Sequence, residues 1–104
     1  MISEFETYLL SISTSMKEAG VEMKIKKQEI SSEHFKLSVG LESQIYVADF
    51  TIWERPSIVQ VDITTLHLAT QKTDFTHLAN PRQITEITEA FEKLLEILKS
   101  KYSH

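Results

Sequence analysis

The 104-residue chain contains no cysteine, only two glycines and only two prolines. The absence of cysteine excludes disulfides and a thiolate nucleophile, and a small domain without disulfides is typical of a reducing compartment. The glycines, Gly20 and Gly40, are too few and too far apart to form a loop that cradles phosphate groups. No apolar run approaches the roughly 18 residues of a membrane span, and the first residues lack a signal-peptide pattern. We therefore expect a cytoplasmic protein without a membrane partner.

Basic residues are also in the minority. The chain has 11 Lys and Arg against 15 Asp and Glu, which gives a formal net charge of −4. Because nucleic-acid-binding domains normally carry a basic surplus, we do not expect nucleic acid as a partner. A content of 41% hydrophobic and 25% charged residues is typical of a globular protein. The length fits one domain over residues 1–104.

Both ends of the chain show the apolar period of a helix. The N-terminal stripe consists of Phe5, Tyr8, Leu9, Ile12, Met16 and Ala19. Ser3 and Glu6 predict a capping box at its start, and Gly20 predicts its end. The C-terminal stripe consists of Ile84, Ile87, Phe91, Leu94, Leu95 and Leu98, extended by Tyr102. We expect Asn80 to cap this second helix, with Pro81 as its first residue.

Between these helices the apolar period changes to two, which is typical of half-buried strands. The predicted strands cover residues 21–26, 35–41, 44–53, 58–65 and, with a weaker pattern, 66–77. The polar residues 28–33 predict a turn. Connections this short exclude parallel crossovers. We therefore predict an α+β fold of order α-β-β-β-β-β-α: an antiparallel meander of four to five strands, with both terminal helices packed on one face.

The third and fourth predicted strands leave one sheet face uncovered. The residues expected to point at the helices are Phe50, Ile52, Val59, Val61 and Ile63. The apolar residues of the other face predict one patch at the hairpin end, made of Ile45, Val47, Trp53 and Ile58. Such patches often mark partner surfaces, and Trp and Arg are enriched in binding hot spots. The partner-binding candidates are Ile45, Asp49, Trp53, Arg55, Ile58 and Asp62.

Two alternatives remain open for this face. Trp53 can instead cap the core at the end of the sheet, and the assignment of the two faces can be reversed, because apolar residues occur in both phases of these strands. Asp49 and Asp62 fall on one face of adjacent strands, where two carboxylates can divide acid and base roles. An open sheet bearing Lys24, Lys26 and Lys36 favours instead a solvated pair balanced by lysines.

The histidines do not predict a metal site. They are His34, His67, His77 and His104. None has a second ligand at helical spacing, although Asp74 lies between two of them, and no cysteine is present. We expect no catalytic residue, no metal and no cofactor, and therefore no enzyme.

The segments YVADFTIWE (residues 46–54) and VQVDI (residues 59–63) resemble a known family. They are similar to small immunity proteins of bacterial polymorphic toxin systems, particularly the TriTu-type family, in which a strand ending in Trp-Glu turns into a strand ending in Asp-Ile or similar. A polar strand with His and Phe and a closing helix follow in that family. Residues 74–77 and the helix from Pro81 take those places here. The resemblance covers residues 43–98 and implies a protein that binds and occludes a cognate toxin without catalysis.

Two other functions fit the same pattern. A type III secretion-type chaperone would hold an effector segment on its sheet and dimerise through a helix. A small ligand-binding protein or pocket enzyme would enclose a deep polar pocket between its helices and a curved sheet. The sequence leaves open whether the chain is a monomer or a homodimer. A toxin-neutralising immunity protein is the function that we predict.

Overall fold

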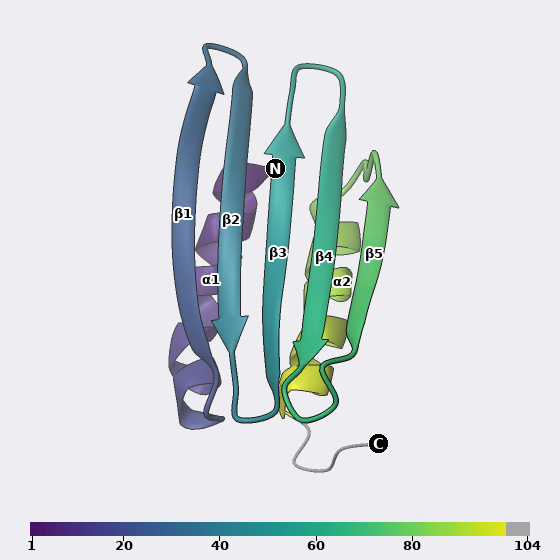
Figure 1. Ribbon diagram of the computed structural model, residues 1–104. Coiled ribbons are helices and arrows are strands. Elements are labelled where there is room, and N and C mark those ends of the chain that lie inside the picture. Colours follow the sequence, from purple (N-terminus) through teal and green to yellow (C-terminus); the bar gives the residue numbers. More distant parts are fainter. Residues whose placement is uncertain (100–104) are drawn as a thin grey trace.

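Figure 1 shows the computed structural model, which describes residues 1–99. The elements are α1 (Ile2–Glu18), β1 (Glu22–Ser31), β2 (His34–Glu42), β3 (Tyr46–Glu54), β4 (Val59–His67), β5 (Thr73–Ala79) and α2 (Ile84–Lys99). The strands form one antiparallel sheet in the order β1-β2-β3-β4-β5, and both helices lie on the same face of it (Figure 1). This arrangement confirms the predicted α+β meander. Tyr102 and His104 lie outside the described residues.

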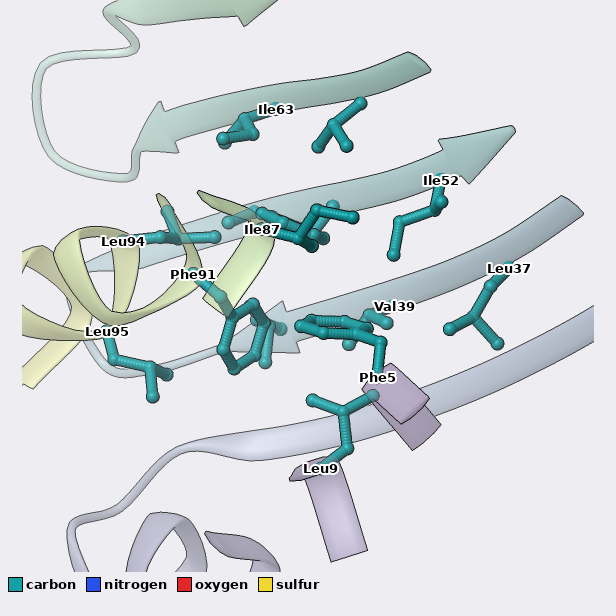
Figure 2. Close-up of a cluster of buried hydrophobic side chains, with 14 of the residues drawn as sticks. Phe5, Leu9, Leu37, Val39, Ile52, Ile63, Ile87, Phe91, Leu94 and Leu95 are labelled. Carbon is teal, nitrogen blue, oxygen red and sulfur yellow. The ribbon is translucent and has the colours of Figure 1, made fainter. Parts of the chain in front are cut away.

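Three aromatic rings join the helices to the sheet at the centre of the core. Phe5 of α1 stacks on Phe50 of β3 at 5.3 Å between ring centroids, and Phe91 of α2 meets both edge-on at 5.3 and 5.1 Å. None of the three is exposed. Figure 2 shows Phe5 and Phe91 among the aliphatic side chains that the sheet contributes. The five sheet residues predicted to face the helices are all buried, so the predicted inward face is confirmed.

The two ends of α1 differ in how well the sequence predicted them. The helix begins at Ile2, so Ser3 lies within its first turn and makes no capping bond. The predicted capping box is wrong, because the Glu6 carboxylate lies 2.9 Å from the Lys27 ammonium of β1 instead. Gly20 ends the helix with φ of 81°, as predicted. The N–H of Val21 donates to the carbonyl oxygen of residue 16 at 2.9 Å, which closes a Schellman motif.

The start of α2 is also set by contacts that the sequence did not reveal. The helix begins at Ile84, so the predictions of Asn80 as cap and Pro81 as first residue are wrong. Asn80 has φ of 45°, and its side-chain oxygen accepts the N–H of Val59 at 3.3 Å. The Glu86 carboxylate accepts the N–H groups of residues 82 and 83 instead. These two backbone bonds hold the pKa of Glu86 below its usual range.

Two strand boundaries differ from the prediction. β1 continues to Ser31, so most of the predicted turn over residues 28–33 is strand. The reason is its ladder with β2, where Gln28 pairs with Lys36 and Glu29 with Phe35. Residues 66 and 67 belong to β4 because they pair with β3, and β5 begins only at Thr73. At the end of β1 side-chain polarity misled the prediction, because both faces of that segment are exposed.

A polar contact links the two helices on the covered side of the sheet. The Tyr8 hydroxyl donates to the Glu92 carboxylate at 3.3 Å. Partial burial and the neighbouring negative charge raise the pKa of Tyr8 to about 12, because both disfavour the phenolate.

Within residues 1–99 no helix is long and apolar enough to cross a membrane.

Candidate binding face

The face of the sheet opposite the helices is the candidate site. Residues 1–99 place no element over it (Figure 1). Because strand side chains alternate, this open face is formed by the residues between the buried ones. From β1 to β5 its main side chains are Lys24, Lys26, Lys36, Ser38, Gly40, Val47, Asp49, Thr51, Trp53, Gln60, Asp62, Thr64, Leu66, Phe75 and His77. The predicted site residues Asp49, Trp53 and Asp62 therefore share one face.

Trp53 lies at the end of β3 next to the hairpin and is half-buried. The Lys36 ammonium sits 4.5 Å from the centre of the indole, and the His34 ring lies 5.9 Å away. Arg55 donates its Nε–H to Nε2 of His34 at 3.3 Å, which ties the turn to the start of β2. Trp53 is thus covered by polar neighbours and lies outside the buried core cluster. We call His34, Lys36, Trp53 and Arg55 the Trp53 cluster.

The two candidate carboxylates lie diagonally on the open face. Asp62 is opposite Thr51 in the ladder, two residues along β3 from Asp49. Asp62 is paired across β4 and β5, where the Nδ1–H of His77 donates to its Oδ1 over 2.6 Å. In the described part of the chain, no lysine lies within 4.0 Å of either aspartate. At Asp62 a histidine therefore takes the place of the expected lysine, and the sequence could have identified it only with the correct β5 boundaries.

The predicted apolar patch is not one surface. Ile58 is 42% exposed and exchanges backbone hydrogen bonds with Arg55 across the hairpin turn, at the same end of the sheet as Trp53. Ile45 precedes β3 at the opposite end, where its carbonyl oxygen accepts the N–H of Leu68 at 2.8 Å. Trp53 lies eight positions after Ile45 along an extended chain, a distance of roughly 26 Å. The prediction that Ile45, Val47, Trp53 and Ile58 form one patch at the hairpin end is therefore wrong.

The charges are distributed unevenly over the molecule. The two helices carry seven acidic and three basic residues, a surplus of −4 that equals the formal net charge of the whole chain. The sheet and its connections, residues 19–83, are close to neutral, with eight acidic and seven basic residues. The β1 and β2 half of the open face carries three lysines that make no ion pair within residues 1–99: Lys24, Lys26 and Lys36. A locally basic strip thus exists on an acidic protein, which the total charge did not predict.

Gly40 leaves a hollow in the middle of the open face. Lys24 and Asp49 are its neighbours across the ladder on either side. The hollow has a volume of about 130 Å³ and Val47 forms part of its lining. A Cβ atom at Gly40 would lie 3.9 Å from both the Asp49 carboxylate and the Lys24 carbonyl oxygen, so the space is free. The site is a shallow surface rather than a deep pocket.

The histidines are divided between the two sides of the sheet. His67 is buried on the helix side, where its Nδ1 accepts the N–H of Thr70 at 3.2 Å and its ring meets Tyr46 edge-on. His77 lies on the open face, so these two histidines cannot bind one metal ion together. Residues 1–99 contain no group of three or more His, Asp or Glu placed to hold a metal.

Comparison with protein-family models, curated proteins and solved structures finds no match to this chain. The fold and the site define a small α+β protein with two helices behind an uncovered five-stranded sheet. Its function must therefore be argued from the open face.

Proposed function

We propose that this chain is a toxin-neutralising immunity protein, which binds a cognate protein toxin through the open face and occludes it without catalysis. The observation that carries the proposal is the Trp53 cluster, which presents an indole beside Lys36 and His34, with Arg55 bonded to His34, on a sheet that nothing in residues 1–99 covers. The resemblance of residues 46–63 to TriTu-type immunity proteins includes the strand that ends in Trp-Glu, next to the turn.

The open face has the physical properties of a protein-binding surface. Its side chains project from paired strands, so little backbone freedom is lost on binding, which favours affinity. Trp and Arg are the residue types that most often dominate binding energy. The lysine strip and the aspartates Asp49 and Asp62 give the face regions of opposite charge, which select orientation and partner. Ile58 extends the apolar contact area at the hairpin end.

To occlude a bound toxin, the protein needs only to cover part of the toxin's surface. A contact of about 800 Å² per partner is typical of stable complexes. The molecule extends over 42 × 27 × 22 Å, so one broad face of the sheet offers an area of that order. The proposed mechanism therefore uses shape and charge alone, and no residue of the open face needs to undergo a reaction.

The proposal is tested with the product of the adjacent gene as the candidate toxin. Co-expression should restore growth of cells that produce the toxin, and calorimetry should give a single stoichiometric binding event. Trp53→Ala and the exposed Arg55→Ala should each weaken binding by roughly 30-fold, which corresponds to about 2 kcal/mol for a hot-spot residue. Leu10→Ala is the control, since Leu10 is 72% exposed on α1, away from the open face.

The readouts separate binding from folding. Circular dichroism and urea unfolding of each variant show whether lost binding follows from lost structure. If Trp53→Ala destabilises the fold but Arg55→Ala and the folded fraction of Trp53→Ala bind normally, the open face is not the contact surface. The same conclusion follows if the wild type, Trp53→Ala, Arg55→Ala and Leu10→Ala all bind and neutralise the toxin equally.

A further inference from the structure

The two edges of the sheet differ in how they are protected against pairing. β1 is protected by charge, with Glu22, Lys24, Lys26, Lys27 and Glu29 among its ten residues. β5 carries only Asp74 and His77 as ionisable residues, and six of its seven residues are exposed. Within residues 1–99 nothing pairs with its outer edge. An edge strand of this kind presents free backbone N–H and C=O groups and is a template for another strand.

Apolar side chains surround this same edge. Phe75 projects from β5 with 66% of its surface exposed, and Ile97 of α2 is 45% exposed. Between β5 and α2 lies a groove with a volume of about 550 Å³, whose lining includes Ile63, Leu94 and Ile97. Exposed apolar residues therefore occur on the strand, in the groove and on the helix that flanks it.

We propose that a second copy of this chain occupies this edge, with β5 pairing antiparallel to β5 of the second copy about a twofold axis perpendicular to the sheet. Such an axis keeps the helices of both copies on one side, so paired residues must lie on the same face of their strands. The axis must then lie at one residue of β5, which pairs with its own copy in the second chain, and not midway between two neighbouring residues of the strand.

The side chains of β5 select one position of the axis. An axis at Asp74 would place two carboxylates directly opposite each other, which is unfavourable. An axis at Phe75 places the two exposed phenyl rings against each other and buries both. It also places Asp74 opposite the second copy's Thr76, and Thr73 opposite the second copy's His77, so that no like charges meet. An axis at Thr76 would instead set each phenyl ring opposite the second copy's His77. The Phe75 axis brings the two exposed rings together, and it is therefore the pairing that we assign.

The same operation fails at the other edge. An axis at Ile25 would pair Lys24 with the second copy's Lys26, and an axis at Lys26 or Lys27 would pair each lysine with its own copy. These three registers of β1 thus bring ammonium groups together, which disfavours a second chain at this edge. Self-association is therefore expected at β5, where the twofold pairing yields a closed dimer in place of an open filament.

The dimer would extend the sheet from five to ten strands. Since the axis is perpendicular to the sheet, both open faces would lie on the same side, with an Asp62–His77 pair on each side of the two Phe75 rings. The apolar grooves between β5 and α2 would face each other. This inference does not depend on the proposed function.

The first test is the mass of the protein by light scattering from micromolar to millimolar concentration. The expected mass is twice the 12.0 kDa of the chain, falling to the single value on dilution. Phe75→Lys should be monomeric throughout the range, whereas Leu10→Lys, which changes an equally exposed residue on α1, should keep the dimer. Circular dichroism verifies that both variants are folded. A wild-type protein that is monomeric throughout, or a dimer unaffected by Phe75→Lys, overturns the proposal.

The second test concerns the register and uses the absence of cysteine from the chain. The double variant Thr73→Cys/His77→Cys should form a disulfide-linked dimer on mild oxidation, because directly opposite residues have the Cβ spacing of a disulfide. Within one strand these positions are roughly 13 Å apart, so they cannot link to each other. Each single variant is a control and should remain uncrosslinked. A dimer that depends on Phe75 but does not crosslink in the double variant overturns the assigned register.

Discussion

Gly40→Ala should stabilise the protein, although the substitution lies in the middle of the sheet. Glycine in a strand interior costs roughly 0.5–1 kcal/mol relative to alanine, because the unfolded chain loses more freedom. Gly20 is the glycine with positive φ, so Gly40 has a strand conformation that alanine adopts without strain. The new Cβ would meet no atom closer than 3.9 Å. We expect the free energy of unfolding to rise by about 0.5–1 kcal/mol.

Urea unfolding followed by circular dichroism measures this change, and the thermal midpoint should rise by roughly 2–6 °C. Gly20→Ala is the matched control and should have the opposite sign. Its φ of 81° is unfavourable for alanine, so we expect a loss of about 1 kcal/mol. A fall in stability for Gly40→Ala would refute the reasoning, since it would mean that the hollow is not free. The same variant narrows the hollow on the open face, so stabilisation combined with weaker toxin binding would support the proposed function.

Three other measurements test the core and the charged contacts. Phe91→Ala should lower the free energy of unfolding by about 3–5 kcal/mol in urea titrations, because it leaves a cavity against the rings of Phe5 and Phe50, and a smaller loss would contradict the placement of Phe91. The raised pKa of Tyr8 means that its contribution to the stability of the fold is complete below about pH 10 and is lost toward pH 12. Tyr8→Phe should therefore remove part of the decrease in stability that the wild type shows at alkaline pH. The lowered pKa of Glu86 means that this residue stabilises the fold fully above the pKa of an unfolded-state glutamate, and that the stabilisation is lost as the pH falls through its folded-state pKa. In thermal melts, Glu86→Gln should therefore lose less stability in acid than the wild type does. An unchanged pH profile would count against the two backbone hydrogen bonds.

The ends of the helices show where local sequence rules give way to tertiary contacts. Gly20 ended α1 as predicted, because a left-handed residue followed by buried Val21 is a local motif. Asn80 has the sequence of a helix cap, but its side-chain oxygen accepts the backbone N–H of Val59, a strand residue 21 positions away in the chain. Glu86 then supplied the missing acceptor for α2. A capping rule counts residues along the chain and cannot detect a competing partner from another element.

The candidate site shows the same difference between what local sequence rules predict and what tertiary contacts decide. Alternation in β3 and β4 correctly placed Asp49, Trp53 and Asp62 on one face, because a period of two determines the side of the sheet. It did not determine position along the strand relative to other elements, so Ile45 was assigned to the wrong end. Nor did it reveal that His77 pairs with Asp62, since this contact depends on the β4–β5 register.

The sequence by itself therefore determined the kinds of elements, their order, the antiparallel sheet and the residues of the core. The reason is that apolar periodicity is a local property of the chain, and burying the apolar side of each element lowers the free energy directly. Tertiary structure decided the charge distribution and the neighbours of Trp53. The acidic surplus lies in the two helices, which leaves the lysines of β1 and β2 unpaired on the open face. The physical reason is that these features depend on which distant residues the strand register brings together, and many registers are compatible with the same alternation of polar and apolar side chains.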